Sequence, residues 1–471
     1  MFTYMKWGLS ISISLYALLH FITYFYESEF LLHVEALSGF FLLLFAAFLL
    51  SLNKFKLPLF LVSLGILIFV LSDTSIIEGF RNGLILMRDI IGLLVIIPMI
   101  SWVLNTEPYI ESIMYSSYRF INTSRKMYIG IASFTQVIAY FLLFGSIPMM
   151  YQFVNKMVGN QHGEPLERFK GTALVRSFAL STIWVVTIPS FIFAVEALDA
   201  SLWLSILQGL FISVCGLVIA VLFSHFEEKK YGVDLTQIIN QEMKKVLSDS
   251  SDFEQGNKAG EFLFLFITLF GTIFVLHEFW PIDLMVIVPL VVVVWTFVYF
   301  IVKKRTGKLV QEMKTYFRKG MVNQSYQFSV MLGAGMMIFS LNQTGFANVI
   351  ISGVDIIQEG LPSLNFLYFL PFIVIILGFL GLGPLTVMVL VAGILQNIDL
   401  PYPPELIVMA ITSGSVISIL LSPLLMPIII LSGQNGMSGF KNGIQFNLFF
   451  AIVFYILVQV YIQSLIVIWL E

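Results

Sequence analysis

Apolar runs of about 20 residues recur along the chain, and each is long enough to cross the hydrocarbon core of a bilayer as a helix. Hydrophobic residues make up 58% of the 471 residues and charged residues only 11%, a balance outside the range of soluble domains. Because lipid offers no hydrogen-bond partners, each segment must pair its own backbone groups. The sequence therefore predicts an all-α polytopic membrane protein in contact with membrane lipid.

We expect about 11 transmembrane helices and two re-entrant hairpins. The predicted spans are 6–26, 29–51, 57–72, 129–155, 172–196, 202–224, 260–278, 281–303, 364–396, 405–432 and 443–470. The regions 83–122 and 320–358 each hold an apolar limb, a polar turn and a shorter limb, which we interpret as hairpins. The alternative is that both are full spans joined by ordinary extramembrane loops.

Charge placement sets the predicted orientation, because basic residues collect on the cytoplasmic side. The most basic stretch, 303–319, is placed inside, and Lys6 and Lys54 then also fall inside. We expect an integral protein of the bacterial plasma membrane with its N-terminus in the cytoplasm and its C-terminus outside. The first apolar run lacks a small-residue cleavage site, so we expect it to remain as a span.

Two stretches of the chain repeat each other without a gap. Residues 80–105 align with 317–342, 237 positions later, and both begin with Phe-Arg-X-Gly and end with Leu-Asn. A second pair follows at nearly the same spacing, Gly-Ser-Ile-Pro at 145–148 and Gly-Leu-Gly-Pro at 381–384. Internal duplication in an apolar chain is typical of transporters, whose substrate site lies where two repeats meet.

Counted through the predicted spans, the two halves enter the membrane from opposite sides. The sequence therefore predicts two inverted repeats. The predicted domains are an extra N-terminal transmembrane helix in 1–28, a first repeat in 29–224, a cytoplasmic loop in 225–259 and a second repeat in 260–471.

Four elements interrupt the apolar pattern. Polar groups mark the turns of the two hairpins: Asn105, Thr106 and Glu107 in the first, and Asn342, Gln343 and Thr344 in the second. Glycine and proline mark the other two: Gly145, Ser146 and Pro148, and Gly381, Gly383, Pro384 and Thr386. Proline removes a backbone donor and glycine permits close approach, so these positions predict either broken helices with exposed carbonyls or ordinary packing kinks. All are candidate substrate-binding residues.

Hydroxyl groups form a fifth candidate feature at Ser413 and Ser415, followed by a Ser-Pro pair at 422–423. Their counterpart in the first half is Ser181-Thr182 with Pro189. Such side chains either line a polar path or bond back to their own helix.

Ionisable residues are few inside the predicted spans. Glu107 is the candidate ion-coupling carboxylate, the alternative being a surface glutamate beyond a helix end. Arg88 and Asp89 are interpreted as interfacial side chains, and Lys170 and Arg176 as anchors at the inner face. The histidines show no metal-ligand spacing, so we expect no metal and no cofactor. Net charge −3 excludes a nucleic-acid partner, and the single Cys215 excludes a disulfide framework.

A family resemblance rests on the second half. The stretch Val-Met-Leu-Gly-Ala-Gly-Met at 330–336, followed by Gln-Thr-Gly-Phe-Ala at 343–347, resembles the glycine-rich hairpin of the ion transporter superfamily. That superfamily includes divalent anion:sodium symporters and arsenite permeases. Ser-Gly-Gln-Asn-Gly at 432–436 is similar to its final motif block. The resemblance implies ion-coupled transport and a homodimer.

The chain departs from this pattern at one place. Residues 381–386 lie where sodium-coupled members carry Ser-Asn-Thr, but here the residues are Gly-Leu-Gly-Pro-Leu-Thr. Since most of the oxygen ligands are lost, a site lined by glycine, proline and aliphatic groups favours a less charged or amphipathic substrate.

These observations predict a secondary active transporter, a symporter or antiporter, that works by alternating access. Its expected cargo is an organic anion or an amphipathic or lipid-linked small molecule, coupled to H⁺ through Glu107 or to Na⁺ through backbone carbonyls. The sequence holds no convergent set of acid, base or metal groups, so we do not expect an enzyme. A rival interpretation is a non-transporting scaffold that binds partners through 225–259.

Overall fold

A computed structural model describes residues 2–71, 75–109, 112–113, 123–158, 163–231, 236, 258–360 and 365–470. Within those ranges every regular element is a helix and there is no strand. Among the described residues, ten helices are long and apolar enough to cross a membrane, or up to 11 if a bent pair is counted as one span. The predicted all-α polytopic membrane fold is therefore confirmed, while the inverted orientation of the repeats stays a prediction.

The chain divides into two compact units. Unit 1 comprises Met1–Thr106, Ile267–Gly360 and Val389–Leu400, and unit 2 comprises Glu107–Phe266, Leu361–Met388 and Pro401–Glu471. Each unit therefore takes segments from both halves of the sequence, which is a different partition from the predicted division by repeats. The predicted loop 225–259 lies mostly outside the described residues.

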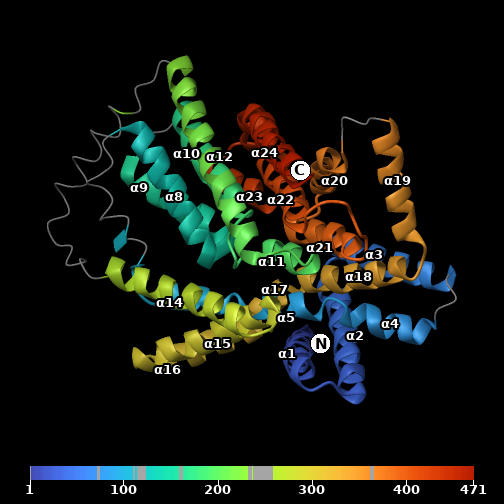
Figure 1. Cartoon of the computed structure of the whole chain (residues 1–471). Coiled ribbons are helices and arrows are strands. Elements are labelled where there is room, and N and C mark those ends of the chain that lie inside the picture. The colour runs from blue at the N-terminus through green and yellow to red at the C-terminus, as the bar shows by residue number, and fades with distance from the viewer. Residues whose placement is uncertain are drawn as a thin grey trace. The chain divides into compact units, whose positions relative to one another are not determined.

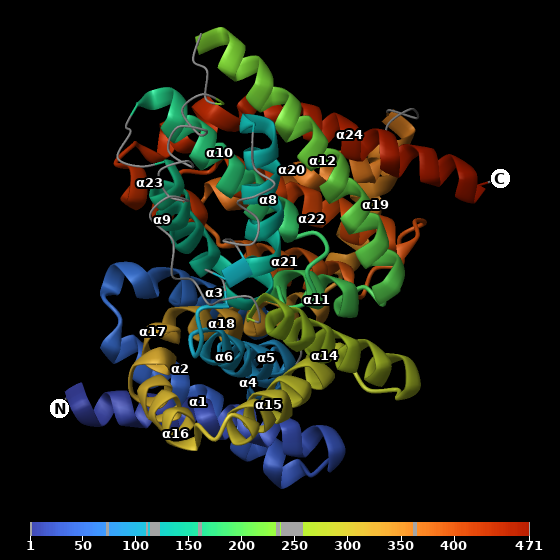
Figure 2. The same ribbon diagram turned by 90° about the vertical axis from the view of Figure 1, so that its left-hand side faces the viewer.

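Unit 1 is built from long apolar helices and shorter connecting ones (Figures 1 and 2). Its helices are α1 (Phe2–Phe25), α2 (Glu29–Leu49), α3 (Leu52–Leu71), α4 (Ile76–Ile85), α5 (Arg88–Ile96), α6 (Met99–Leu104), α15 (Leu284–Val302), α16 (Thr306–Thr315), α17 (Met321–Asn323), α18 (Ser325–Asn342) and α19 (Phe346–Gly360). A π-helical turn, η3 (Tyr316–Gly320), precedes α17. Helix α14 (Lys258–Phe279) begins in unit 2 and ends in unit 1.

Glycines let the central helix α18 pack closely against its neighbours in unit 1. A Cβ added at Gly335 would lie 2.6 Å from the Gly83 carbonyl oxygen, and one at Gly65 would lie 2.9 Å from the Met336 carbonyl carbon. Before α18 begins, the Tyr316 hydroxyl of η3 donates to the carbonyl of Val95 in α5 over 2.9 Å. Helix α18 therefore runs antiparallel to the segment α4–α6.

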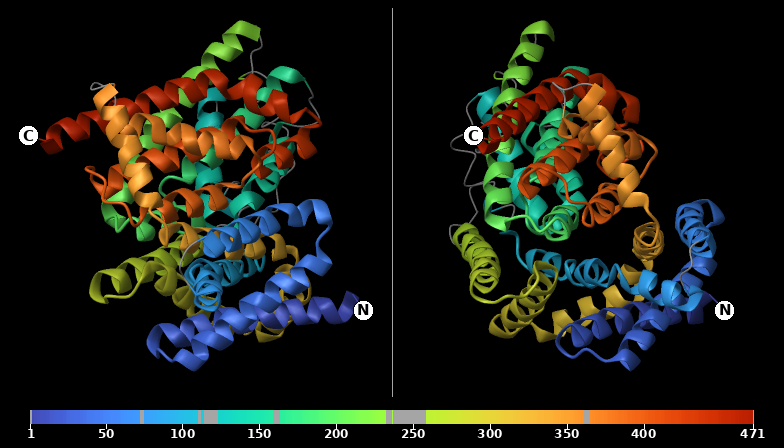
Figure 3. Two further views of the ribbon diagram at one scale, coloured as in Figure 1. Left: turned by 90° about the vertical axis from the view of Figure 1, so that its right-hand side faces the viewer. Right: turned by 45° about the vertical axis from the view of Figure 1, so that its right-hand side comes forward.

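Unit 2 combines long helices with shorter ones that follow one another after brief breaks. Figure 3 shows the ribbon from two further directions. Its helices are α8 (Ser124–Leu142), α9 (Ser146–Val158), α10 (Glu164–Ser181), α11 (Pro189–Ala197), α12 (Leu202–Tyr231), α20 (Phe366–Phe379), α22 (Pro404–Leu421), α23 (Met426–Asn435) and α24 (Phe446–Leu470). The 3₁₀ turn η2 (Leu143–Gly145) follows α8, and the π-helical turn η4 (Lys441–Gln445) precedes α24. Helix α21 (Pro384–Leu395) passes from unit 2 into unit 1.

One predicted span is wrong as a continuous helix. The segment 172–196 is divided between α10 and α11 by an irregular stretch at 182–188, and α10 is not among the candidate spans. The segment 364–396 is also divided, into the two shorter apolar helices α20 and α21, at the position where glycine and proline predicted an interruption. Hydropathy alone does not register such breaks, because the residues at them are themselves mostly apolar.

The two hairpin predictions have different outcomes. In the second, α18 and the following helix are bent by 80° at a short break, as in a broken span or a re-entrant loop. In the first, Ile77–Leu104 forms a 28-residue apolar helix, long enough to span a bilayer by itself. Its return limb lies largely outside the described residues, so that hairpin stays a prediction.

Candidate functional site: broken helices and buried charges

The first predicted break separates α8 from α9 in unit 2. Leu143 has a positive φ of 49°, a conformation that is costly for a branched side chain. The buried Ser146 begins the next helix and donates its hydroxyl to the Leu143 carbonyl over 2.7 Å. Gly145 and Pro148 lie on either side of this serine, so the α-helix gives way to a 3₁₀ turn at the predicted position, within the segment Ser124–Lys156 that counts as one candidate span.

The second predicted break separates α20 from α21. Gly381 has φ +86°, the left-handed conformation that favours glycine. No atom lies within 4 Å of a Cβ added at Gly383, so this position faces open space. Pro384 begins α21, and Thr386, two residues further on, is buried. The Ser422 hydroxyl donates to the Gly378 carbonyl over 3.1 Å and so pairs one of the carbonyls freed at the break.

Each half of the sequence adds another interrupted helix to unit 2 directly after the first. In the first half the break is 182–188, where the Thr187 hydroxyl donates to the Tyr140 carbonyl over 2.5 Å. In the second half the break is 422–425, between α22 and α23. Proline lies in the first turn of the helix after each break, at Pro189 and Pro427. Unit 2 therefore contains the same succession of two broken helices from each half.

The two candidate serines of α22 differ in their hydrogen bonds. The Ser413 hydroxyl donates to the Ala410 carbonyl over 2.7 Å, the back-bonding that the sequence left as one alternative. The Ser415 hydroxyl is buried and has no hydrogen-bond partner. Among the described residues, Ser415 is thus the one of the pair whose buried hydroxyl has no hydrogen-bond partner.

The polar turns in unit 1 are not brought together. Asn105 directly follows the end of α6, and Asn342 is the last residue of α18. Because α18 runs antiparallel to α4–α6, these two residues lie at opposite ends of the packed helices. The Asn105 carbonyl accepts from Lys308 Nζ over 3.0 Å, at the corner that leads into α16. The expectation that both turns present polar groups to one shared pocket is therefore wrong within this unit.

The side chains at these turns are also engaged locally or exposed. The Thr106 hydroxyl donates to the Trp102 carbonyl and the Thr344 hydroxyl to the Leu341 carbonyl, so both bond back to their own helices. Gln343 is exposed. In unit 2, Glu107 forms an ion pair with Lys258 over 3.1 Å.

A charged cluster that the sequence interpretation placed at the membrane surface is buried inside unit 2. The Arg176 side chain is 0% exposed; its Nε donates to Asn447 Oδ1 and its Nη2 to the Phe446 carbonyl, both over 2.9 Å. Glu227 Oε1 lies 3.7 Å from Nη2, and the guanidinium lies 4.7 Å from the centre of the Phe450 ring. The interpretation of Arg176 as an inner-face anchor is wrong.

Lys170, six residues before Arg176 on α10, is also buried. Its ammonium donates to Asn155 Oδ1 over 2.7 Å and also pairs with Glu167. The second Glu167 oxygen accepts from the Tyr151 hydroxyl over 2.7 Å. The spacing of positions 167, 170 and 176 on one helix carried this signal, but an amphipathic reading of α10 assigned its charges to water.

The amides of the last motif block join this region. Asn435 and Asn442 exchange hydrogen bonds over 2.8 and 3.1 Å, and Asn442 also donates to the Ser432 hydroxyl over 3.0 Å. A Cβ added at Gly171 would lie 3.8 Å from Asn442 Oδ1, so this amide cluster packs against α10. The motif that carried the family resemblance thus has a structural role beside Lys170 and Arg176.

Unit 1 holds a second buried ionisable cluster, formed by α1, α2 and α5 within membrane-spanning segments. His20 and Glu35 are both 0% exposed. His20 Nδ1 lies 3.4 Å from Asp89 Oδ1, and Arg88 Nη1 lies 3.9 Å from Glu35 Oε2. The Thr23 hydroxyl donates to the same Glu35 oxygen over 3.0 Å. Asp89 faces the buried His20 while 34% of its side chain is exposed, so its interpretation as an interfacial side chain stays a prediction.

This cluster is incompletely hydrogen-bonded. Both ring nitrogens of His20 and Oε1 of Glu35 are buried without a hydrogen-bond partner. Buried polar groups are normally paired, and ionisable groups inside membrane segments usually mark ion or proton pathways. The sequence signal was present in the spacing of His20, Glu35 and Asp89 within three apolar runs, but only the packing of those runs brings them together.

No group of three or more His, Cys, Asp or Glu side chains that could hold a metal ion occurs among the described residues. No protein-family model and no curated protein matches this chain. The functional argument therefore rests on the geometry of the two units.

Proposed function

We propose that this chain is a secondary active transporter that moves an organic anion or an amphipathic solute by alternating access. The observation that carries the proposal is the succession of two broken helices from each half of the sequence in unit 2. A break leaves backbone N–H and C=O groups without helical partners, and membrane proteins keep such groups only where protein or a polar cavity satisfies them. Discontinuous helices of this kind form the substrate and ion sites of many secondary transporters.

The division into units supports the same proposal. Each unit combines a segment from the first half with one from the second, so corresponding parts of the two halves belong to the same compact body. Two bodies assembled in this way are what alternating access uses, because one changes its position against the other around a fixed site. The inverted orientation of the halves and the resemblance to the ion transporter superfamily are part of this proposal.

The proposed substrate site is the pair of breaks around Gly145 and Gly381. Gly383 faces open space, and Ser415 offers an unpaired hydroxyl in the same unit. Backbone carbonyls, N–H groups and a few hydroxyls recognise a carboxylate or an ester without the dense oxygen cage that sodium requires. A partly apolar organic anion therefore fits the chemistry better than a multiply charged one.

For the coupling ion, we propose the proton. Glu107 forms an ion pair with Lys258 and lies beyond the end of the candidate span Ile77–Leu104. Glu35 lies inside a membrane segment with one oxygen unpaired and His20 and Asp89 in the same cluster. A carboxylate beside a histidine can accept and pass on a proton, so this cluster replaces Glu107 as the coupling candidate.

The test is current measurement on proteoliposomes adsorbed to a supported membrane, with a panel of monocarboxylates of increasing chain length and an imposed proton gradient. The key variant is Gly383→Leu, which fills the open space at the break. The matched control is Gly271→Leu in α14, where a Cβ also meets no atom within 4 Å. We expect Gly383→Leu to abolish the current while Gly271→Leu retains it.

Two outcomes would overturn the proposal. The first is equal currents from wild type and Gly383→Leu, which would remove the substrate site from the break. The second is the absence of current for the whole panel combined with loss of a cellular phenotype when 225–259 is replaced by a neutral linker. That combination would favour the scaffold instead.

A further inference from the structure

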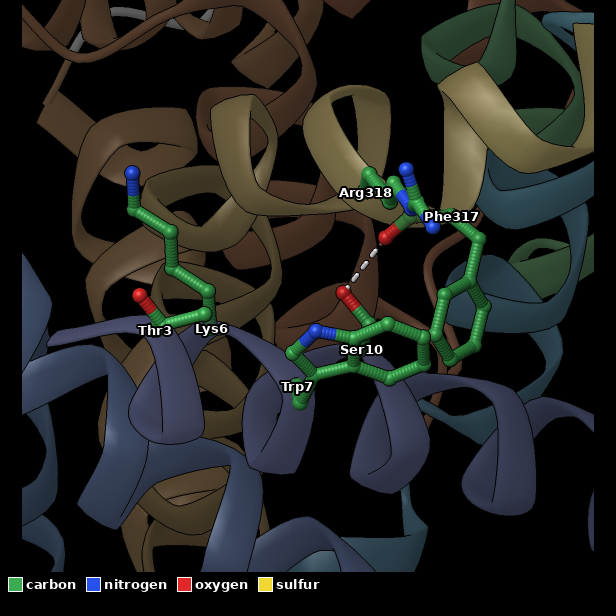
Figure 4. A pocket seen from close by; sticks show the side chains of 6 residues that line it. All are labelled: Thr3, Lys6, Trp7, Ser10, Phe317 and Arg318. Atoms are coloured by element: carbon green, nitrogen blue, oxygen red, sulfur yellow. Dashed lines mark hydrogen bonds between the residues drawn. The ribbon is translucent and has the colours of Figure 1, made fainter. Parts of the chain in front are cut away.

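Unit 1 contains a pocket that the proposed transport steps do not use. It has a volume of about 300 Å³ and lies between the start of α1 and the π-helical turn η3. Figure 4 shows Lys6 and Arg318 on either side of it, with Ser10 between them donating its hydroxyl to the Phe317 carbonyl over 2.7 Å. Two cations that belong to segments more than 300 residues apart thus frame one opening.

An apolar groove of about 570 Å³ adjoins this pocket and shares Trp7, Phe317 and Arg318 with it. Its further lining is almost entirely apolar: Val95, Met99, Trp102, Val310, Met313 and Met321. The volume is within the range of sites that hold a small organic ligand or part of an acyl chain. The pocket and the groove therefore form one amphipathic site with a basic end and an apolar end.

Trp7 stands where the two parts join. The Trp7 side chain is 45% exposed. The centre of the Trp7 ring lies 5.4 Å from the centre of the Phe317 ring and 5.9 Å from the Arg318 guanidinium. Tryptophan next to arginine and lysine is typical of the level where lipid headgroups meet hydrocarbon. The arrangement places the site at that depth of the membrane.

The electrostatics of the site are one-sided. Lys6, Lys314 and Arg318 line it, and none of the described residues that line the pocket or the groove is acidic. Below the site, burial raises the pKa of the Tyr316 phenol, which stays protonated and donates to Val95. The floor is therefore neutral and fixed, and the positive charge at the opening has no partner within the lining.

We propose that this site binds one anionic phospholipid of the surrounding membrane. Its phosphate lies between Lys6 and Arg318, and one acyl chain occupies the groove along Met99 and Trp102. A lipid fits better than a soluble phosphate, because the groove is larger than the basic pocket and would otherwise remain apolar and open. This proposal is independent of the transport function.

The test is native mass spectrometry of the intact protein released from micelles doped with phosphatidylglycerol or with phosphatidylcholine of the same acyl chains. We expect wild type to retain one phosphatidylglycerol in preference to phosphatidylcholine. A basic residue near the membrane surface contributes about 1 kcal/mol to binding of anionic lipid, so Lys6→Gln and Arg318→Gln should each weaken retention about fivefold. The double variant should lose the preference.

The matched control is Lys319→Gln, which removes the same charge one position along the chain from a residue that lines neither cavity. We expect it to change retention less than twofold. Ser14→Phe probes the groove, and Ser14→Ala controls for loss of the serine hydroxyl. Phe at this position should reduce retention of the lipid without changing the weak binding of glycerol phosphate.

Three results would overturn the proposal. One is equal retention of the two lipids by wild type, and another is a loss in Lys319→Gln as large as in Arg318→Gln. The third is displacement of the lipid by millimolar inorganic phosphate or glycerol phosphate, which would make the pocket a site for a soluble anion.

Discussion

The two units bury charge in different ways. In unit 2 the Arg176 guanidinium donates through Nε to an amide oxygen and through Nη2 to a backbone carbonyl, with a carboxylate nearby, while its Nη1 is buried without a hydrogen-bond partner. In unit 1 Glu35 accepts one hydrogen bond, from Thr23, and both ring nitrogens of His20 are unpaired. A paired charge stabilises one arrangement of helices, whereas an underpaired one is free to change its protonation state. The comparison assigns a structural role to the cluster in unit 2 and a functional one to that in unit 1.

The largest expected effect tests the structural role. Arg176→Leu leaves the Asn447 amide oxygen and the Phe446 carbonyl without their donor, while Glu227 keeps its ion pair with Arg168. Removing one partner of a buried, hydrogen-bonded charge costs about 3–5 kcal/mol, so we expect the free energy of unfolding to fall by that amount. Unfolding in mixed detergent micelles measures it.

Arg176→Lys serves as the comparison variant, because it keeps the charge but loses the planar fork that reaches both acceptors. Its stability should lie between those of wild type and Arg176→Leu. A loss below about 1 kcal/mol in Arg176→Leu would show that the paired cation is not what orders unit 2.

The next effect concerns how the broken helices are packed. A Cβ added at Gly209 on α12 would lie only 2.0 Å from the Ile183 carbonyl oxygen, inside the break between α10 and α11. Gly209→Ala must push backbone against backbone, and such overpacking typically costs about 1–3 kcal/mol. Gly271→Ala is the control, since its Cβ meets open space. Thermal unfolding that is unchanged in both variants would mean that α12 does not hold the break.

The interrupted helices of unit 2 show which breaks could be predicted from the sequence and which could not. Glycine and proline marked the interruptions near Gly145 and Gly381, because their effect on a helix is local and independent of neighbours. The break at 182–188 has no glycine or proline within it, although Pro189 follows it directly, and α12 approaches it closely at Gly209. Close packing of a segment from elsewhere in the chain has no local signature.

The same distinction between local sequence marks and distant packing applies to the candidate site. Spacing along one helix placed Ser413 and Ser415 correctly on α22, but their opposite hydrogen-bonding states depend on the surroundings. The buried clusters were missed for a related reason. A charge near the end of an apolar run is assigned to the interface by composition, and only the packing of three separate helices shows that His20 faces Asp89.

The functional role assigned to unit 1 predicts a smaller change in stability but a clear change in proton dependence. Glu35→Gln keeps the shape of the side chain and a partner for Thr23, so the free energy of unfolding should change by about 1 kcal/mol. The amide does not titrate, so transport driven by a proton gradient should stop while exchange without a gradient continues. Currents recorded with and without the gradient separate the two.

The control is Glu29→Gln, which removes a carboxylate that is 78% exposed on the same helix. Its currents should match those of wild type. Proton-driven transport that survives in Glu35→Gln but not in Glu107→Gln would return the coupling role to the first polar turn.

The smallest expected effect is the coupling energy of an exposed ion pair in unit 2. Comparing it with a less exposed pair measures how burial changes that energy. Lys441 and Glu164 form an ion pair over 2.8 Å with side chains 29% and 43% exposed, whereas Arg168 and Glu227 pair over 2.7 Å with both side chains 16% exposed. Water screens the first pair, so a double-mutant cycle should give a coupling of only about 0.2–1 kcal/mol that falls further in high salt. The second pair is less hydrated and should show a larger coupling that salt changes little. If both cycles gave the same energy and the same salt dependence, depth of burial would not be what distinguishes the structural charges of unit 2 from those at its surface.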